Sequence, residues 1–161
     1  MNDAELIRAA ITALAFRDRD RYRAVREQYR TYHPRHEAEQ LMWVAKVCVE
    51  CRFPISKVEE EPEGPYIDHA ELGRFLAETR QAGPDYVVPP NVLEVEGVVR
   101  GLLGEEGILN QIAPASMRGI VLFLIQYLVD TMPELREDFD QAIDEARQYA
   151  YHQLMGTEPE Q

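Results

Sequence analysis

The sequence predicts an all-α protein: a single-domain bundle of six or seven helices around a buried central helix at about residues 116–131. Residues 120–129 are apolar except for Gln126, so this segment can be buried on every side. Amphipathic segments with helical spacing lie before and after it. Capping residues followed three positions later by glutamate mark several helix starts, among them Asp68 and Asn91.

Three helices are expected in the first third of the chain. The first spans about residues 3–16, and the second ends near residue 32, because Pro34 disfavours helical backbone in the residue before it. The run RDRDR at 17–21 either separates these two helices or lies inside one long helix, and the sequence leaves both alternatives open. The third helix spans about residues 36–53 and stops before the next proline.

Residues 54–67 form an acidic, proline-rich segment with no apolar period, and we expect a surface loop there. A chain of 161 residues is long enough to bury one core, and no internal repeat divides it. The sequence therefore predicts one helical domain over residues 1–155. Residues 156–161 are polar and are expected to form a disordered tail.

Two helices of the second half carry features of their own. The segment from Asn91 to about residue 103 is expected to be helical, but alternation over 92–99 also leaves a strand open. Within it, Gly97 and Gly101 either allow the close approach of another helix or indicate a break. One last helix is expected over about residues 131–154, with proline in its first turn.

The net charge of −12 is unevenly distributed along the chain. Residues 1–52 hold ten Lys and Arg against eight Asp and Glu, which gives +2. Residues 53–161 hold seven against 21, which gives −14. A strongly acidic body repels nucleic acid and anionic membranes and favours cationic partners. We therefore expect no nucleic-acid partner and no membrane partner.

The apolar stretch at 120–129 has ten residues, whereas a membrane span needs roughly 20. We expect a buried core helix there. No basic region precedes an apolar run near residue 1, and the two cysteines form no disulfide framework. Arginine outnumbers lysine 15 to 2, which is typical of GC-rich bacterial genomes. A bacterial, cytoplasmic protein is expected.

Cys48 and Cys51 have the spacing of a redox or metal motif. They also continue the apolar stripe of Leu41 and Val44, and free cysteine packs as a small hydrophobic residue. His36 lies about 18 Å from Cys48 along an unbroken helix at about 1.5 Å per residue, too far to share a zinc ion. We expect both cysteines to belong to the core, and no metal site.

The second predicted helix carries the candidate partner-binding surface. Four arginines spaced four, three and four residues apart form one stripe, and tyrosines form a second stripe beside it. A basic face next to aromatic rings is typical of a surface that binds nucleic acid or an acidic protein, and the acidity of the rest of the chain favours the protein. The alternative is an arginine face paired within the protein or a dimer. The candidate residues are Arg19, Arg23, Arg26, Arg30, Tyr22 and Tyr29.

No catalytic motif is present: there is no glycine-rich phosphate loop, no Gly-x-Ser-x-Gly and no His-Glu-x-x-His. No cofactor is therefore expected. The sequence names no function, but it favours a non-catalytic protein-binding or regulatory module that acts through helix-mediated contacts. The alternative is a small-molecule-binding protein or enzyme with a pocket between helices lined by Tyr, Trp and Arg side chains.

The first predicted helix is apolar on more than one side, because only Glu5, Arg8 and Thr12 are polar within residues 4–16. An outer helix of a monomer needs only one buried face. The additional apolar face predicts a homodimer with an isologous contact. The candidate dimer-contact residues are Ile7, Ile11 and Leu14.

Overall fold

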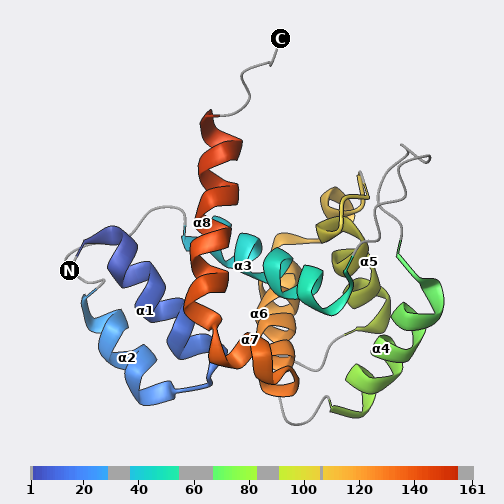
Figure 1. Ribbon diagram of the computed structural model, residues 1–161, viewed down its shortest axis with the longest axis horizontal. Coiled ribbons are helices and arrows are strands. Elements are labelled where there is room, and N and C mark those ends of the chain that lie inside the picture. Colours follow the sequence, from blue (N-terminus) through green and yellow to red (C-terminus); the bar gives the residue numbers. More distant parts are fainter. Residues whose placement is uncertain (1, 29–36, 55–66, 83–90, 106, 156–161) are drawn as a thin grey trace.

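A computed structural model describes residues 2–28, 37–54, 67–82, 91–105 and 107–155, and helices are the only regular secondary structure in this part of the chain (Figure 1). The elements are α1 (Asp3–Ala15), α2 (Arg19–Gln28), α3 (Glu37–Arg52), α4 (His69–Ala82), α5 (Val92–Leu102), the 3₁₀ helix η2 (Leu109–Gln111), α6 (Pro114–Thr131), α7 (Pro133–Glu137) and α8 (Phe139–Met155). The all-α prediction is confirmed. Residues 55–66 of the expected loop and the expected tail at 156–161 lie outside the described residues.

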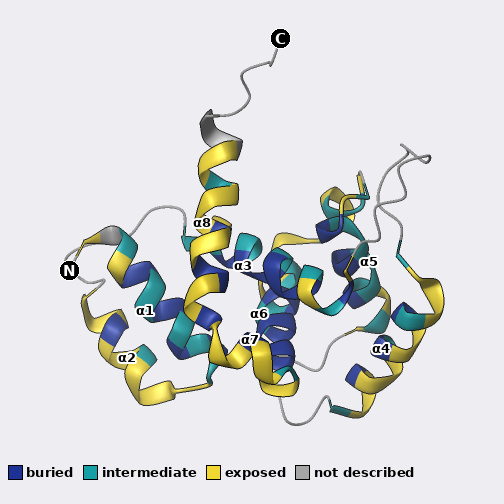
Figure 2. Cartoon of the chain, in the orientation of Figure 1, coloured by how far each residue is buried: buried dark blue, intermediate teal, exposed yellow. Residues whose placement is uncertain are grey.

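The centre of the bundle is α6, as its sequence predicted. All residues from Ile120 to Val129 are buried except Leu122, and α1, α3, α5 and α7 pack around this helix. Figure 2 shows the dark blue of buried residues concentrated on α6 and α3. The most extensive contacts of α3 are with α6 and α8, so α3 shares the central position.

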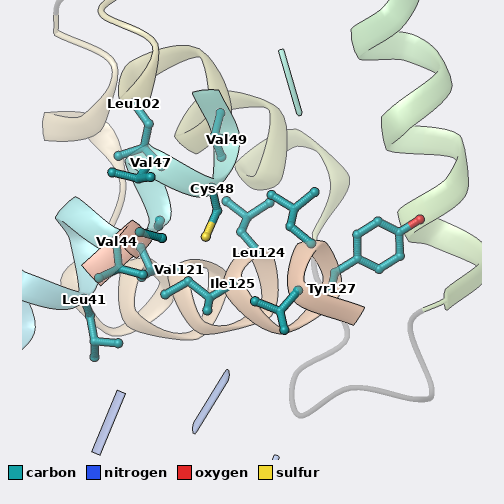
Figure 3. Packing of buried hydrophobic residues seen from close by; sticks show 14 of the residues in the cluster. Leu41, Val44, Val47, Cys48, Val49, Leu102, Val121, Leu124, Ile125 and Tyr127 are labelled. Atoms are coloured by element: carbon teal, nitrogen blue, oxygen red, sulfur yellow. The ribbon is translucent and has the colours of Figure 1, made fainter. Parts of the chain in front are cut away.

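The α3–α6 contact is built from small and branched side chains. Figure 3 shows Val44 and Cys48 of α3 close to Leu124 and Ile125 of α6. All four side chains are at most 1% exposed. Burial of apolar area on this scale is the main favourable free energy of folding. The helical pattern of the sequence therefore corresponds to a real packing face.

The run RDRDR separates α1 from α2. Arg17 has φ 57°, a left-handed conformation that cannot continue a right-handed helix. Asp18 then caps α2, where its carboxylate accepts a hydrogen bond from the Arg21 amide at 3.0 Å. At the other end of α1, Asn2 and Glu5 form a reciprocal capping box.

Helix α5 is continuous, which excludes the strand alternative for residues 92–99. Asn91 caps it by accepting from the amides of Leu93 and Glu94. Gly97 and Gly101 allow η2 and its flanking residues to approach: a Cβ at Gly101 would lie 2.5 Å from Leu109 Cγ.

The prediction of one last helix is wrong, because the chain breaks at Asp138 between α7 and α8. Asp138 has φ −112° and ψ 35°, outside the helical region. Its carbonyl accepts from the amides of Gln141 and Ala142, which starts α8 in a new direction (Figure 1). Leu135 before the break and Phe139 after it are both buried. The break therefore lets both helices contribute side chains to the core.

Candidate functional site

The arginines predicted to bind a partner lie on α2. Arg19, Arg23 and Arg26 are exposed, and Arg23 pairs with Asp20 at 3.7 Å within the same helix. Tyr22 is half-buried and packs against a small apolar cluster of Leu6, Ala10 and Val25 that joins α2 to α1. Its hydroxyl lies 3.5 Å from Arg26. Arg30 and Tyr29 lie outside the described residues.

The residues predicted to contact a second subunit lie inside the chain. Ile7 and Ile11 are 9% and 0% exposed in the main core, and Leu14 packs against that core. The opposite side of α1 is covered by α2 through Leu6 and Ala10. Both apolar sides of α1 are thus used within one protomer. The homodimer itself stays a prediction.

The cysteine pair divides between core and surface. Cys48 is fully buried, as expected, but the prediction that Cys51 is also core is wrong, because its side chain is exposed. Burial raises the pKa of Cys48 far above its ordinary value. Partial burial and the negative charges of Glu145, Glu50 and Glu134 raise the pKa of the Cys51 thiol as well. Both thiols are therefore poor nucleophiles at neutral pH.

Cys51 lines a groove between α3, α7 and α8, which we call the acidic groove. Its volume is about 430 Å³. The apolar part includes the buried residues Val47, Leu135 and Ala142. The complete lining is Val47, Cys51, Met132, Glu134, Leu135, Asp138, Gln141, Ala142 and Glu145.

Three exposed carboxylates rim this groove: Glu134, Asp138 and Glu145. They differ from the neighbouring acids Asp140 and Asp144, which both pair with Arg8 of α1. No ion pair within the described ranges involves the three rim carboxylates. The groove thus combines an apolar base with uncompensated negative charge.

A second hollow, which we call the aromatic pocket, lies between α3, α8 and the chain around the end of α5. Its volume is about 380 Å³. The rings of Trp43 and Tyr149 stack, with centroids 5.8 Å apart and planes inclined by 25°. The complete lining is Met42, Trp43, Lys46, Gly101, Leu102, Gly104, Leu109, Tyr149 and His152.

A polar network holds the aromatic pocket together. Lys46 Nζ lies 3.0 Å from a carboxylate oxygen of Glu50, donates to the Leu102 carbonyl at 2.9 Å, and sits 5.6 Å from the Tyr149 ring centroid. The Tyr149 hydroxyl donates to Glu50 at 2.9 Å. Partial burial and this contact with a carboxylate raise the pKa of Tyr149 to about 12.

Sequence reasoning identified neither hollow, although one signal was available. Trp43, Lys46 and Glu50 are spaced three and four residues apart, so they share a face of α3. Tyr149 follows about a hundred residues later, and no local pattern places it beside them. The alternative function, a pocket between helices lined by Tyr, Trp and Arg, stays a prediction; the lining of the aromatic pocket includes Trp43, Tyr149 and Lys46 and no arginine.

Two other kinds of site are absent from the part of the chain that the structure describes. No cluster of three or more His, Cys, Asp or Glu side chains there could hold a metal ion. None of the described helices is long and apolar enough to cross a membrane.

No protein-family model, curated protein or solved structure matches the chain.

Proposed function

We propose that this protein is a non-catalytic protein-binding module that docks a basic segment of a partner protein in the acidic groove. The observation that carries the proposal is the combination of the apolar base at Val47, Leu135 and Ala142 with the unpaired carboxylates of the rim. A segment with an apolar anchor flanked by lysine or arginine complements both features.

The two parts of the groove have different roles in this proposal. Exposed ion pairs contribute only about 0–1 kcal/mol each, so the apolar base must supply most of the affinity. The carboxylates select among partners, because they attract basic segments and repel acidic ones. The net charge of −12 extends this attraction beyond the groove and favours fast association at low salt.

The arginine face of α2 is a second proposed contact surface, suited to an acidic partner. Arg19 and Arg23 are exposed on α2, which packs mainly on α1, so both side chains are accessible to a partner. Charge reversal of both residues is expected to weaken binding of such a partner while the helical content stays the same. Unchanged binding would remove α2 from the proposal.

Cys51 provides a direct test of the groove, because it is exposed in the groove whereas Cys48 is fully buried. A small diazirine reagent attached to Cys51 at alkaline pH would be photoactivated in an extract of the native host. The expected product is a cross-link to a segment in which lysine or arginine flanks an apolar residue. Mass spectrometry identifies the cross-linked peptide.

The matched variants are Glu145→Arg and Glu137→Arg, since both residues are exposed acids but only Glu145 lines the groove. Glu145→Arg should reduce the cross-linked product by about tenfold, whereas Glu137→Arg should leave it within about twofold. Equal yields in both variants, or cross-links to acidic segments, would contradict the proposal. A cross-link to α2 of a second copy would assign the groove to self-association instead, with dimerisation measured by light scattering.

A further inference from the structure

We infer that the aromatic pocket is a binding site for a small, planar, uncharged aromatic molecule that carries a hydrogen-bond acceptor. This site lies apart from the acidic groove: the two share no lining residue. It therefore goes beyond the proposed docking function. Each property of the ligand follows from a different group in the pocket.

Planarity follows from the stacked rings of Trp43 and Tyr149. Aromatic rings prefer offset-stacked or edge-on neighbours, and a flat ligand can add to such an arrangement with little empty space. The apolar side chains of Met42, Leu102 and Leu109 complete the lining. The volume of about 380 Å³ lies within the range of small-molecule sites.

The acceptor follows from Lys46. An ammonium group has three N–H donors; here one donates to the Leu102 carbonyl, while Nζ also pairs with the Glu50 carboxylate and lies over the Tyr149 ring. A further N–H donor can reach a ligand in the pocket that Lys46 lines. Because these contacts fix the position of Nζ, a carbonyl oxygen or ring nitrogen can accept this bond without reorganising the side chain.

The absence of charge on the ligand follows from the balance around Lys46. Glu50 already compensates the ammonium charge, and the chain as a whole carries −12, so an anion gains little attraction in the pocket. A cation would be placed beside the Lys46 ammonium and repelled. An uncharged molecule meets neither difficulty.

The test uses Trp43, which is the single tryptophan of the chain and therefore gives one indole N–H signal in a ¹H–¹⁵N NMR spectrum. The full chain would be titrated separately with benzamide, cyclohexanecarboxamide and benzoate. Benzamide is planar and uncharged and carries a carbonyl; the second probe lacks planarity and the third is an anion. Benzamide should shift the Trp43 signal saturably and bind at least about fivefold more tightly than either of the others.

Tyr149→Leu and Tyr151→Leu form a matched pair on α8, because both tyrosines are exposed to solvent but only Tyr149 lines the pocket. Tyr149→Leu should weaken benzamide binding by about fivefold, and Tyr151→Leu should leave it unchanged. Lys46→Met removes the ammonium donor but keeps a long apolar side chain. It should weaken benzamide binding without changing the Tyr149 ring.

Circular dichroism confirms that each variant is folded, and either pocket variant alone decides the question if the other fails to fold. The inference is overturned if benzamide gives no saturable shift, if cyclohexanecarboxamide binds equally well, or if both pocket variants bind benzamide as the wild type does. Tighter binding of benzoate than of benzamide would overturn the uncharged character of the ligand.

Discussion

Cys48 and Cys51 lie less than one turn apart on α3, yet Cys48 is fully buried against α6 while Cys51 is exposed in the acidic groove. Three residues at about 3.6 per turn are about 60° short of a full turn, so the two side chains point roughly 60° apart around the helix axis. That rotation, close to the end of α3, is enough to move a thiol from the core to the surface. The two thiols should therefore differ strongly in reactivity.

The first prediction is that a thiol reagent modifies Cys51 alone in the native protein and both cysteines after unfolding. The raised pKa of Cys51 keeps the thiolate population low, so modification at pH 8 should be slower than for free cysteine and should accelerate as the pH rises. Glu145→Gln removes the largest charge contribution to this shift and should increase the rate; Glu137→Gln is the control. Mass spectrometry of the time course measures which cysteine is modified and how fast. Rapid modification of Cys48 in the folded chain would contradict the prediction.

The second prediction compares alanine at two helical glycines. Gly73 in α4 has nothing within 4 Å of the position that a Cβ would occupy, so Gly73→Ala should raise the free energy of unfolding by about 0.5–1 kcal/mol through helix propensity. At Gly101 the Cβ would lie 2.5 Å from Leu109 Cγ, so Leu109 must move. Gly101→Ala should lower the free energy of unfolding by about 1–3 kcal/mol. Urea denaturation measures both, and a stabilised Gly101→Ala variant would contradict the packing described.

The sequence predicts those parts of the fold that depend on neighbours along the chain. The caps at Asp68 and Asn91 and the apolar run from Ile120 to Val129 are local signals, and the structure confirms them. Features that depend on distant contacts are missed. The break at Asp138 follows from packing of Leu135 and Phe139 on other helices.

The same distinction applies to the candidate sites. The apolar stripe of α3 indicates which face is buried, but it does not indicate where along the helix the core ends, so Cys51 is misplaced. The surplus of apolar residues in α1 is visible in the sequence. The sequence does not show that Leu6 and Ala10 are buried together with Val25 of α2, because this contact depends on how α2 folds back onto α1.

The third prediction concerns Gln126, a polar residue that is 2% exposed in α6. Its Nε2 donates to the Leu14 carbonyl at 3.0 Å, while its Oε1 has no hydrogen-bond partner in the described chain. Gln126→Met removes the unpaired oxygen at similar volume, and Leu14 still accepts from the Arg17 amide at 3.1 Å. The free energy of unfolding should stay within about 1 kcal/mol of wild type or rise, because an unpaired buried acceptor costs about 1–3 kcal/mol.

Gln126→Ala is the contrasting variant, since it removes the same oxygen but leaves a cavity in the centre of the bundle. It should lower the free energy of unfolding by about 2 kcal/mol or more. Urea denaturation of the two variants separates the polar effect from the packing effect. A loss of similar size in both would mean that the hydrogen bond to Leu14 matters more than the unpaired oxygen.

The fourth prediction concerns stability at alkaline pH and follows from Tyr149. In the unfolded chain this phenol loses its proton near its ordinary pKa of 10.0, whereas in the folded chain its pKa is raised to about 12. Between these values the folded state holds more protons than the unfolded state, so stability falls as the pH rises. Below pH 10 the contribution is fully present. The wild type should therefore lose stability relative to Tyr149→Phe as the pH rises from 10 towards 12, as measured by urea denaturation at a series of pH values.

The comparison with Tyr149→Phe isolates this phenol, because the Phe variant keeps every other ionisable group and their effects cancel in the difference. Glu50→Gln removes the carboxylate that accepts from the Tyr149 hydroxyl, so a smaller pH dependence of this difference is expected in the Glu50→Gln background. Parallel curves for the wild type and Tyr149→Phe would show that the folded protein does not raise the pKa of Tyr149.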